Sequence, residues 1–184
     1  MKRSLYILIS LFVLVILAAC GREQTIDYRS ILDTETGHTL SLGDSRADIE
    51  RALGDYTFHV ESDRFNIFEY TYALRVIFED DVAVAFFAGN ASDSDRFELL
   101  GYRIGMTRED ATSNFQHAYE ADTEGLMIAM HHFDNFYDAQ GNLTDEANAF
   151  IQARLGWVEP TGAEGRLITL FVGYSRVVNA QSEN

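Results

Sequence analysis

The sequence predicts an α+β fold in which helices pack on one face of an antiparallel sheet, built from two tandem helix-plus-hairpin repeats. A ten-residue pattern occurs twice, at 40–49 and at 102–111, and apolar residues at helical spacing follow each copy. After the first copy, apolar residues occupy alternate positions over 68–78, which is typical of a strand with one buried face. These two observations together indicate a helix and a hairpin in each half.

Each copy of the pattern is expected to begin with a short strand and a turn. The shared order is apolar, any residue, apolar, Gly, any residue, Ser or Thr, Arg, any residue, Asp, apolar, and the two glycines lie 62 residues apart. The alternating apolar residues suit a strand, and Gly43 and Gly105 permit the turn that leaves it.

The polar residues of the pattern are expected to cap helices. Ser45 and Thr107 stand at N-cap positions, where a side-chain oxygen accepts from N–H groups of the first turn. Asp48 and Asp110, three residues later, fit a variant of the capping box and favour the positive end of the helix dipole. Because capping accounts for these residues, no catalytic role is expected for them. The glycines expected to follow the two helices are Gly54 and Gly125.

The strands of the first half are expected to form an antiparallel hairpin. The alternating run of 68–78 has a break near 72–74, and residues 82–88 resume the same parity after the acidic turn. In the second half, strands are expected at 126–133 and 166–178. An inserted helix is expected near 144–155, because Phe150, Ile151 and Leu155 lie at helical spacing before Gly156.

The N-terminal residues predict export and lipidation. Lys2 and Arg3 precede an almost wholly apolar run that ends in Leu17-Ala18-Ala19-Cys20, which resembles the lipobox of bacterial lipoproteins. Residues 1–19 are therefore expected to be a cleaved signal peptide, with a diacylglyceryl group on Cys20. An uncleaved membrane helix is the alternative, but the apolar run of about 15 residues is shorter than the roughly 20 that a span requires.

The mature chain is expected to be a tether followed by two repeats. Residues 20–36 are polar and mixed and suit a tether, so the folded part is expected to begin near Gly37. The first repeat then covers 37–95, the second covers 96–180, and 181–184 form a tail. Without a thiol other than Cys20, the fold is expected to have no disulfide.

The charge of the chain excludes some partners. The 184 residues include 29 acidic and 14 basic ones, a formal net charge of −15, and loss of Lys2 and Arg3 with the signal makes it more negative. Such a charge repels phosphate backbones and anionic headgroups, so nucleic acid is not expected as a partner. A basic protein would be tolerated better, although solubility alone also explains the acidity.

Residues able to perform chemistry are few. No nucleophile, phosphate-loop or dinucleotide motif is present, so an enzyme is not expected, and neither is a cofactor. His132 and Asp134 are weak metal candidates, since they share one face of a strand, whereas the adjacent His131 faces away. The alternative to a binding module is an exported hydrolase or a small-ligand or metal-binding protein, with its site in 131–146.

Aromatic residues are the candidates for a protein-binding face. Most of them are expected in the core, but a subset lining one exposed sheet face would supply rigid contact area for a partner. The residues expected on such a face are Tyr70, Tyr72, Phe86 and Trp157.

The motif also carries a family resemblance. A strand, Gly43, Ser45, a helix, Leu53-Gly54 and an aromatic hairpin resemble the small-lipoprotein family that includes the outer-membrane assembly factor BamE, also called SmpA or OmlA. Two such units in one chain look similar to the tandem organisation of β-lactamase inhibitory protein, over roughly 38–178. The resemblance implies an α+β fold and a binding or scaffolding role. The expected function is therefore a protein-binding or envelope scaffolding module, held by lipid on the extracytoplasmic side of a membrane.

Overall fold

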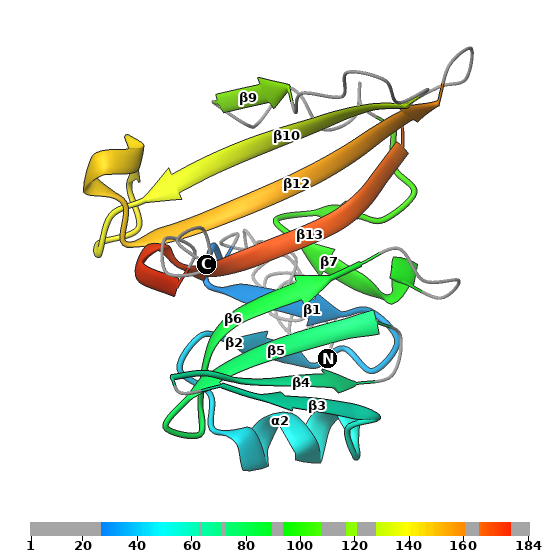
Figure 1. The fold of residues 1–184 in the computed structure, drawn as a ribbon, viewed down its shortest axis with the longest axis vertical. Coiled ribbons are helices and arrows are strands. Elements are labelled where there is room, and N and C mark those ends of the chain that lie inside the picture. Colours follow the sequence, from blue (N-terminus) through cyan, green and yellow to red (C-terminus); the bar gives the residue numbers. More distant parts are fainter. Residues whose placement is uncertain are drawn as a thin grey trace, which may run out of the picture.

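Two antiparallel sheets make up most of the structure, a computed structural model that describes residues 27–62, 64–70, 73–89, 94–107, 117–120, 128–160 and 166–177 (Figure 1). The small sheet has the strand order β2-β1-β7-β8. Its strands are β1 (Ser30–Asp33), β2 (Thr39–Ser41), β7 (Phe97–Leu99) and β8 (Tyr102–Arg103).

The large sheet has nine strands in the order β11-β10-β12-β13-β6-β5-β4-β3, with β9 pairing β10 beside β11. Its two halves meet where β6 pairs β13. The strands are β3 (Phe58–Glu61), β4 (Asn66–Tyr70), β5 (Leu74–Glu79), β6 (Val82–Ala88), β9 (His117–Glu120), β10 (Ile128–Tyr137), β11 (Leu143–Thr144), β12 (Ile151–Pro160) and β13 (Arg166–Tyr174).

The predicted fold class is wrong, because the described chain is mostly β-structure and helices do not cover a sheet. Helical structure in the described residues is limited to α2 (Arg46–Leu53), the 3-10 turns η2 (Ser94–Arg96) and η3 (Glu146–Asn148), the 3-10 residue Ala73, and one turn at 175–177. The face of the large sheet that was expected to carry helices packs instead against the small sheet and α2. The main core therefore lies between two sheets, with side chains of both in one cluster.

The helix expected near 144–155 is absent, because residues from 151 onward form β12. Ile151 and Leu155 fit helical spacing, but Ile151, Ala153, Leu155 and Trp157 also alternate, and all four are fully buried. Alternation with Gln152 and Arg154 is the pattern that the sheet uses. In the other expected helix, residues 117–120 form β9, and residues 108–116 lie outside the described part of the chain.

The helix cap and the hairpin predicted for the first half of the chain are confirmed. Ser45 caps α2, and its hydroxyl oxygen accepts from the Asp48 N–H at 3.2 Å. The break between β4 and β5 falls at 71–73, and β6 returns antiparallel to β5 through a turn in which Asp80 and Asp81 have φ of 51° and 60°. Two successive positive φ values are typical of a type I′ hairpin, whose twist matches that of the strands.

The parity expected for 82–88 is wrong at its beginning. The register between β5 and β6 shifts between Ile77 and Phe78, so that Val82 is 39% exposed. Val84 then lies in a smaller apolar cluster apart from the main core, whereas Phe86 and Ala88 belong to the main core. The bulge moves the first residues of β6 off the expected face.

The two copies of the ten-residue pattern make the same backbone pairing. In each, the glycine donates its N–H to a carbonyl on a strand of the large sheet, and that strand residue donates back to the residue after the glycine. The donors and acceptors are Gly43 to Ala83 (2.8 Å) and Ala83 to Asp44 (2.8 Å), and Gly105 to Leu167 (2.8 Å) and Leu167 to Met106 (2.9 Å). Isolated bridges from Ser45 to Val82 and from Thr107 to Arg166 follow.

The segment expected as a tether contains a central strand. β1 pairs with both β2 and β7, and Ile31 is 1% exposed, so the folded part begins before Gly37. The alternation that builds β1 is too short to stand out from its polar surroundings. The predicted signal peptide and Cys20 lie outside the described residues, and none of the described helices has the length and hydropathy that a membrane span requires.

A buried ion pair joins the β1–β2 hairpin to η2. Asp33 is fully buried and accepts two hydrogen bonds from Arg96, one of them at 2.7 Å. Thr36 donates its hydroxyl to Asp33 at 2.7 Å, and Thr34 donates its N–H to the Arg96 carbonyl at 2.9 Å. Burial by itself raises the pKa of Asp33, but the hydrogen bonds from Arg96, Thr36 and two backbone N–H groups outweigh it and lower the pKa to about 2.

This lowered pKa predicts a loss of stability in acid. A carboxylate with a folded pKa of about 2 and an unfolded value of 3.8 stabilises the fold above pH 4, and the contribution disappears as the pH falls toward 2. The expected loss is about 2 kcal/mol, measured by urea unfolding across this range. In Asp33→Asn the free energy of unfolding should depend less on pH in the same window. An unchanged pH dependence in that variant would contradict the assignment.

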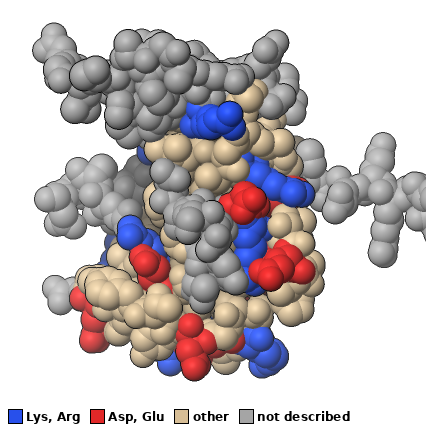
Figure 2. Space-filling view, turned by 90° about the vertical axis from the view of Figure 1, so that its right-hand side faces the viewer, with Lys and Arg blue, Asp and Glu red and all other residues tan. Residues whose placement is uncertain are grey.

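The pair of Arg154 with the buried Asp134 is also partly buried, and most of the remaining ion pairs of the described residues lie nearer the surface. On the face shown in Figure 2, acidic and basic side chains are interspersed rather than gathered by sign. Examples are Arg75 with Glu69 at 2.7 Å and Arg103 with Glu98 at 2.7 Å, each with a half-exposed arginine. Exposed pairs of this kind contribute about 0 to 1 kcal/mol each to the free energy of unfolding, so they add little to stability.

Candidate protein-binding edge

Strand β3 is an exposed edge of the large sheet. It pairs with β4, and no other described strand pairs with it, so one row of its backbone groups has no strand partner in that part of the chain. The side chains are exposed too, with Tyr56 just before the strand at 45%, Phe58 at 57% and Val60 at 42%. Large apolar residues on an open edge are unusual in a monomer, because such an edge is a template for another chain.

The register with β4 explains why these side chains face solvent. Phe58 lies opposite Glu69 and Val60 opposite Ile67, whereas His59 lies opposite the core residue Phe68. Successive side chains of a strand point to opposite faces, so Phe58 and Val60 lie on the face away from the main core.

Contacts on the other face fix the strand in place. The His59 ring stacks on the Phe68 ring with centroids 4.2 Å apart, and Tyr56 meets the same ring edge-on at 4.8 Å. Thr57 donates both its N–H (2.8 Å) and its hydroxyl (3.0 Å) to the Glu69 carbonyl. These contacts attach the edge to β4, while Phe58 and Val60 remain exposed.

Two carboxylates flank the exposed apolar residues. Asp55 precedes them and Glu61 ends the strand, and both side chains are exposed, with no hydrogen bond or ion pair from either carboxylate to another described residue. The neighbouring Glu69 is different, because Arg75 holds its carboxylate at 2.7 Å. The edge thus presents exposed apolar side chains with a carboxylate before and after them in the sequence, and alternation places Glu61 on the face of His59.

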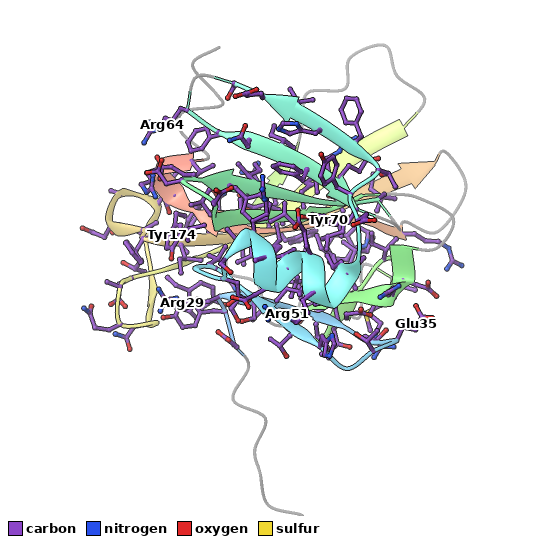
Figure 3. All side chains as sticks on the ribbon, turned by 90° about the horizontal axis from the view of Figure 1, so that it is seen from below. Arg29, Glu35, Arg51, Arg64, Tyr70 and Tyr174 are labelled. Atoms are coloured by element: carbon purple, nitrogen blue, oxygen red, sulfur yellow. The ribbon has the colours of Figure 1, made fainter. Side chains whose placement is uncertain are left out.

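The aromatic residues that the sequence suggested for a binding face lie elsewhere. Tyr70, Phe86 and Trp157 are 1%, 0% and 0% exposed and belong to the main core, so their expected role in binding is wrong. Figure 3 shows Tyr70 behind α2, in the layer between the sheets. Tyr72 lies outside the described residues. In the sequence, the pattern that indicates this edge strand is the alternation of Phe58 and Val60 with polar residues.

Burial of Tyr70 gives a testable prediction. Its hydroxyl has no hydrogen-bond partner in the described part of the chain, and burial, together with the charge of Glu50, raises its pKa to about 12. Tyr70→Phe should therefore raise the free energy of unfolding by about 1 kcal/mol, because an unpaired buried polar group is removed. Urea unfolding measures it, with the half-exposed Tyr56→Phe as the control expected to change little. A loss of stability in Tyr70→Phe would contradict the prediction.

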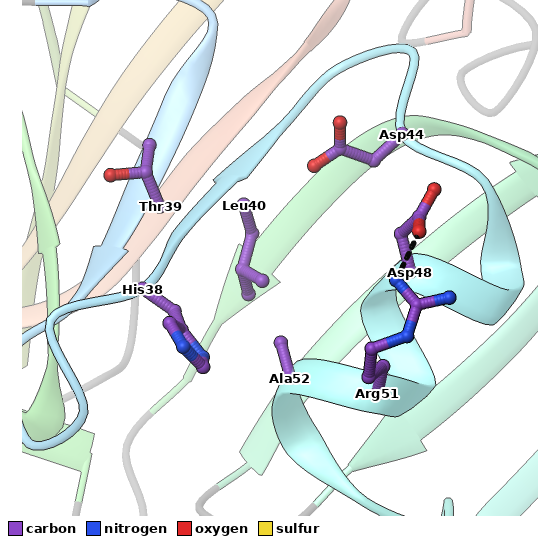
Figure 4. Close-up of a pocket in the computed structure, with 7 residues that line it drawn as sticks. All are labelled: His38, Thr39, Leu40, Asp44, Asp48, Arg51 and Ala52. Carbon is purple, nitrogen blue, oxygen red and sulfur yellow. Dashed lines mark hydrogen bonds and ion pairs between the residues drawn. The ribbon is translucent and has the colours of Figure 1, made fainter.

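A hollow beside α2 holds charged groups that already have partners. It has a volume of about 270 Å³ and lies between the β2 hairpin and α2 (Figure 4). Asp48 accepts from Ser45 at 2.6 Å and from Arg51 at 2.6 Å, and these hydrogen bonds lower its pKa. Asp44 accepts from the Ser41 N–H at 2.7 Å. The residues lining the hollow are His38, Thr39, Leu40, Asp44, Asp48, Arg51 and Ala52.

Of the two weak metal candidates, only Asp134 has a described side chain. Asp134 is 1% exposed and accepts two hydrogen bonds from Arg154, at 2.7 and 3.0 Å. The His132 side chain is not described. In segment 131–146, Asp138 is engaged by its own turn, with the N–H groups of Gln140 and Asn142 each 2.9 Å from its Oδ1. Across the described ranges, no three or more potential metal ligands come together.

The second set of capping residues is described only in part. Gly105 has a φ of 93° and makes the turn that the sequence predicted. Thr107 forms a bridge with Arg166, and Asp110 lies outside the described residues, so the second N-cap stays a prediction.

Comparison with protein-family models, with curated proteins and with solved structures finds no match to this chain.

Proposed function

We propose that this protein is a protein-binding module held at the extracytoplasmic side of a membrane by lipid on Cys20. The lipobox-like residues 17–20 support the anchor. The observation that carries the binding role is the β3 edge, where Phe58 and Val60 are exposed on an unpaired strand. Exposed apolar groups favour association, because their removal from water is worth about 25 cal/mol per Å².

The polar groups favour binding over catalysis. Catalysis by acid and base needs carboxyl or imidazole groups placed to exchange protons with a substrate. Asp48 and Asp134 instead hold arginines, and their hydrogen bonds maintain the ends of α2 and the pairing of β10 with β12. These residues are better explained as structural.

Metabolic labelling tests the anchor. Cells fed an alkyne fatty acid should incorporate it into the wild-type protein and not into Cys20→Ala, which should also leave the membrane fraction. Ser10→Ala, inside the apolar run, is the control and should behave as wild type. Fatty-acid incorporation into Cys20→Ala would contradict the proposal.

Photo-crosslinking in living cells tests the binding role. A benzophenone amino acid placed singly at the exposed positions Phe58, Leu143 and Phe150 should yield a discrete heavier adduct from at least one position. An adduct that reappears in independent preparations and is identified as one protein supports the proposal. Absence of a discrete adduct at all three positions would contradict it.

A further inference from the structure

We infer that β3 binds an extended segment of a basic protein by strand addition, with apolar side chains of that segment beside Phe58 and Val60 and Arg or Lys near its ends. This inference rests on the proposed function and names its site and the chemistry of its partner. In strand addition, main-chain hydrogen bonds supply affinity, and side chains at alternate positions supply specificity.

Three other described edges are shorter. β2 has three residues, and β8 and β11 have two each, so each offers fewer backbone groups to a partner. β9 has four residues and pairs only with β10, and β3 is distinguished from it by the described exposed side chains of Phe58 and Val60. β3 has four residues, and the residues just before it are exposed, with bends at Asp55 and Thr57. Natural edges are often blunted by Lys or Pro, and residues 55–61 contain neither.

The outer face of β3 offers a place for the side chains of an added strand. Phe58 and Val60 lie on one face, and Ile67 of β4 lies beside Val60 as a partly buried neighbour. An added strand would lie about 4.8 Å from β3, so its alternate side chains would contact Phe58 and Val60 directly. β-branched apolar side chains such as valine suit this position, because β-branched and aromatic groups pair well across strands.

Charge selects a basic partner over an acidic one. Asp55 and Glu61 are six residues apart, which is at most about 20 Å, and neither carboxylate has a cationic partner among the described residues. The chain as a whole carries a formal charge of −15, which attracts a basic segment and repels an acidic one. Cationic residues near both ends of the partner would complete these two pairs.

The same charges disfavour a second copy of this chain. In an antiparallel pair of two β3 strands centred on Phe58, Asp55 of each copy would lie opposite Glu61 of the other. Like charges directly opposite each other across two strands are destabilising. The two ends of the edge therefore act against self-association.

Peptide binding to the purified lipoprotein in detergent tests the inference. The probe is a fluorescent seven-residue peptide of alternating valine and threonine with arginine at each end, so that its arginines have the spacing of Asp55 and Glu61, and its binding is followed by anisotropy. We expect saturable binding that weakens as salt rises, and a tenfold or greater loss for a peptide with N-methylated central amides. A peptide with glutamate at both ends should bind at least tenfold more weakly. No binding of the arginine peptide, or equal binding of all three, would overturn the inference.

Variants locate the binding on β3. Phe58→Lys should abolish binding, and Asp55→Asn with Glu61→Gln should weaken it about tenfold and remove most of its salt dependence. Leu143→Lys, at another exposed apolar position, is the matched control and should bind as wild type. Circular dichroism confirms that each variant is folded. Loss of binding in Leu143→Lys equal to that in Phe58→Lys would overturn the assignment, as would a dimer that Phe58→Lys dissociates.

The crosslinking experiment separates this inference from the proposed function. An adduct from Phe58, with none from Leu143 or Phe150, supports both. An adduct from Leu143 or Phe150 alone leaves the binding role in place and overturns the β3 site.

Discussion

Arg96→Leu should destabilise the protein by about 3 to 5 kcal/mol, because it leaves the Asp33 carboxylate buried without its cation. Asp33 is fully buried and Arg96 is 12% exposed, so water cannot replace the two hydrogen bonds that are lost. For a domain of this size, such a loss lowers the melting temperature by about 10 °C. Calorimetry or thermal circular dichroism measures the shift.

A matched surface pair is the control for Arg96→Leu. Arg51 pairs with Asp48 at 2.6 Å, but its side chain is 74% exposed, so Arg51→Leu should cost less than about 1 kcal/mol. Asp33→Leu combined with Arg96→Leu should be more stable than Arg96→Leu alone, because no unpaired charge remains. Equal losses in Arg96→Leu and Arg51→Leu would contradict a buried pair.

Trp157→Ala should cost about 3 to 5 kcal/mol of stability, because it opens a cavity in the main core. Trp157 is fully buried, lies opposite Leu167 and meets the Phe133 ring edge-on with centroids 5.0 Å apart. Urea unfolding measures the loss. Phe150→Ala, at a 43% exposed position, should change stability by less than about 1 kcal/mol.

Comparing the stability losses of Trp157→Ala and Phe150→Ala distinguishes a core role for Trp157 from a role on a binding surface. A tryptophan on a binding surface would lose affinity on substitution while the fold kept its stability. A change below about 1 kcal/mol in Trp157→Ala would therefore place this residue outside the core and contradict the packing of the two sheets around it.

The first half of the fold follows from local signals. The Ser45 cap, the short helix α2 and the acidic turn at Asp80 and Asp81 depend on residues close in sequence, so the pattern predicts them. The offset of 62 residues also identified the two glycine turns, and both pair with a strand of the large sheet.

The second half depends on pairing between distant segments. Ile151 and Leu155 fit a helix and a strand equally well. The segment forms strand β12 because it pairs with β10 on one side and with β13 on the other. β1 is too short to predict alone and is stabilised by β2 and β7. Local spacing cannot show these partners, which is why the expected helices became strands.

The candidate site was missed for a related reason. The alternation of Phe58 and Val60 indicates a strand with an apolar face, and such a face is normally expected to turn inward. Only the register with β4 shows that His59 faces the core and that Phe58 and Val60 face out. Of the aromatic residues suggested by the sequence, Tyr70, Phe86 and Trp157 lie in the main core, and Tyr72 lies outside the described residues.

The most direct test of the β3 site is an NMR titration of the isotope-labelled protein with the arginine-ended peptide. We expect the largest amide shift changes at residues 55–61, with slowed hydrogen exchange in the same strand and little change around the hollow beside α2. The largest changes at that hollow or elsewhere, with β3 unaffected, would contradict recognition through this edge.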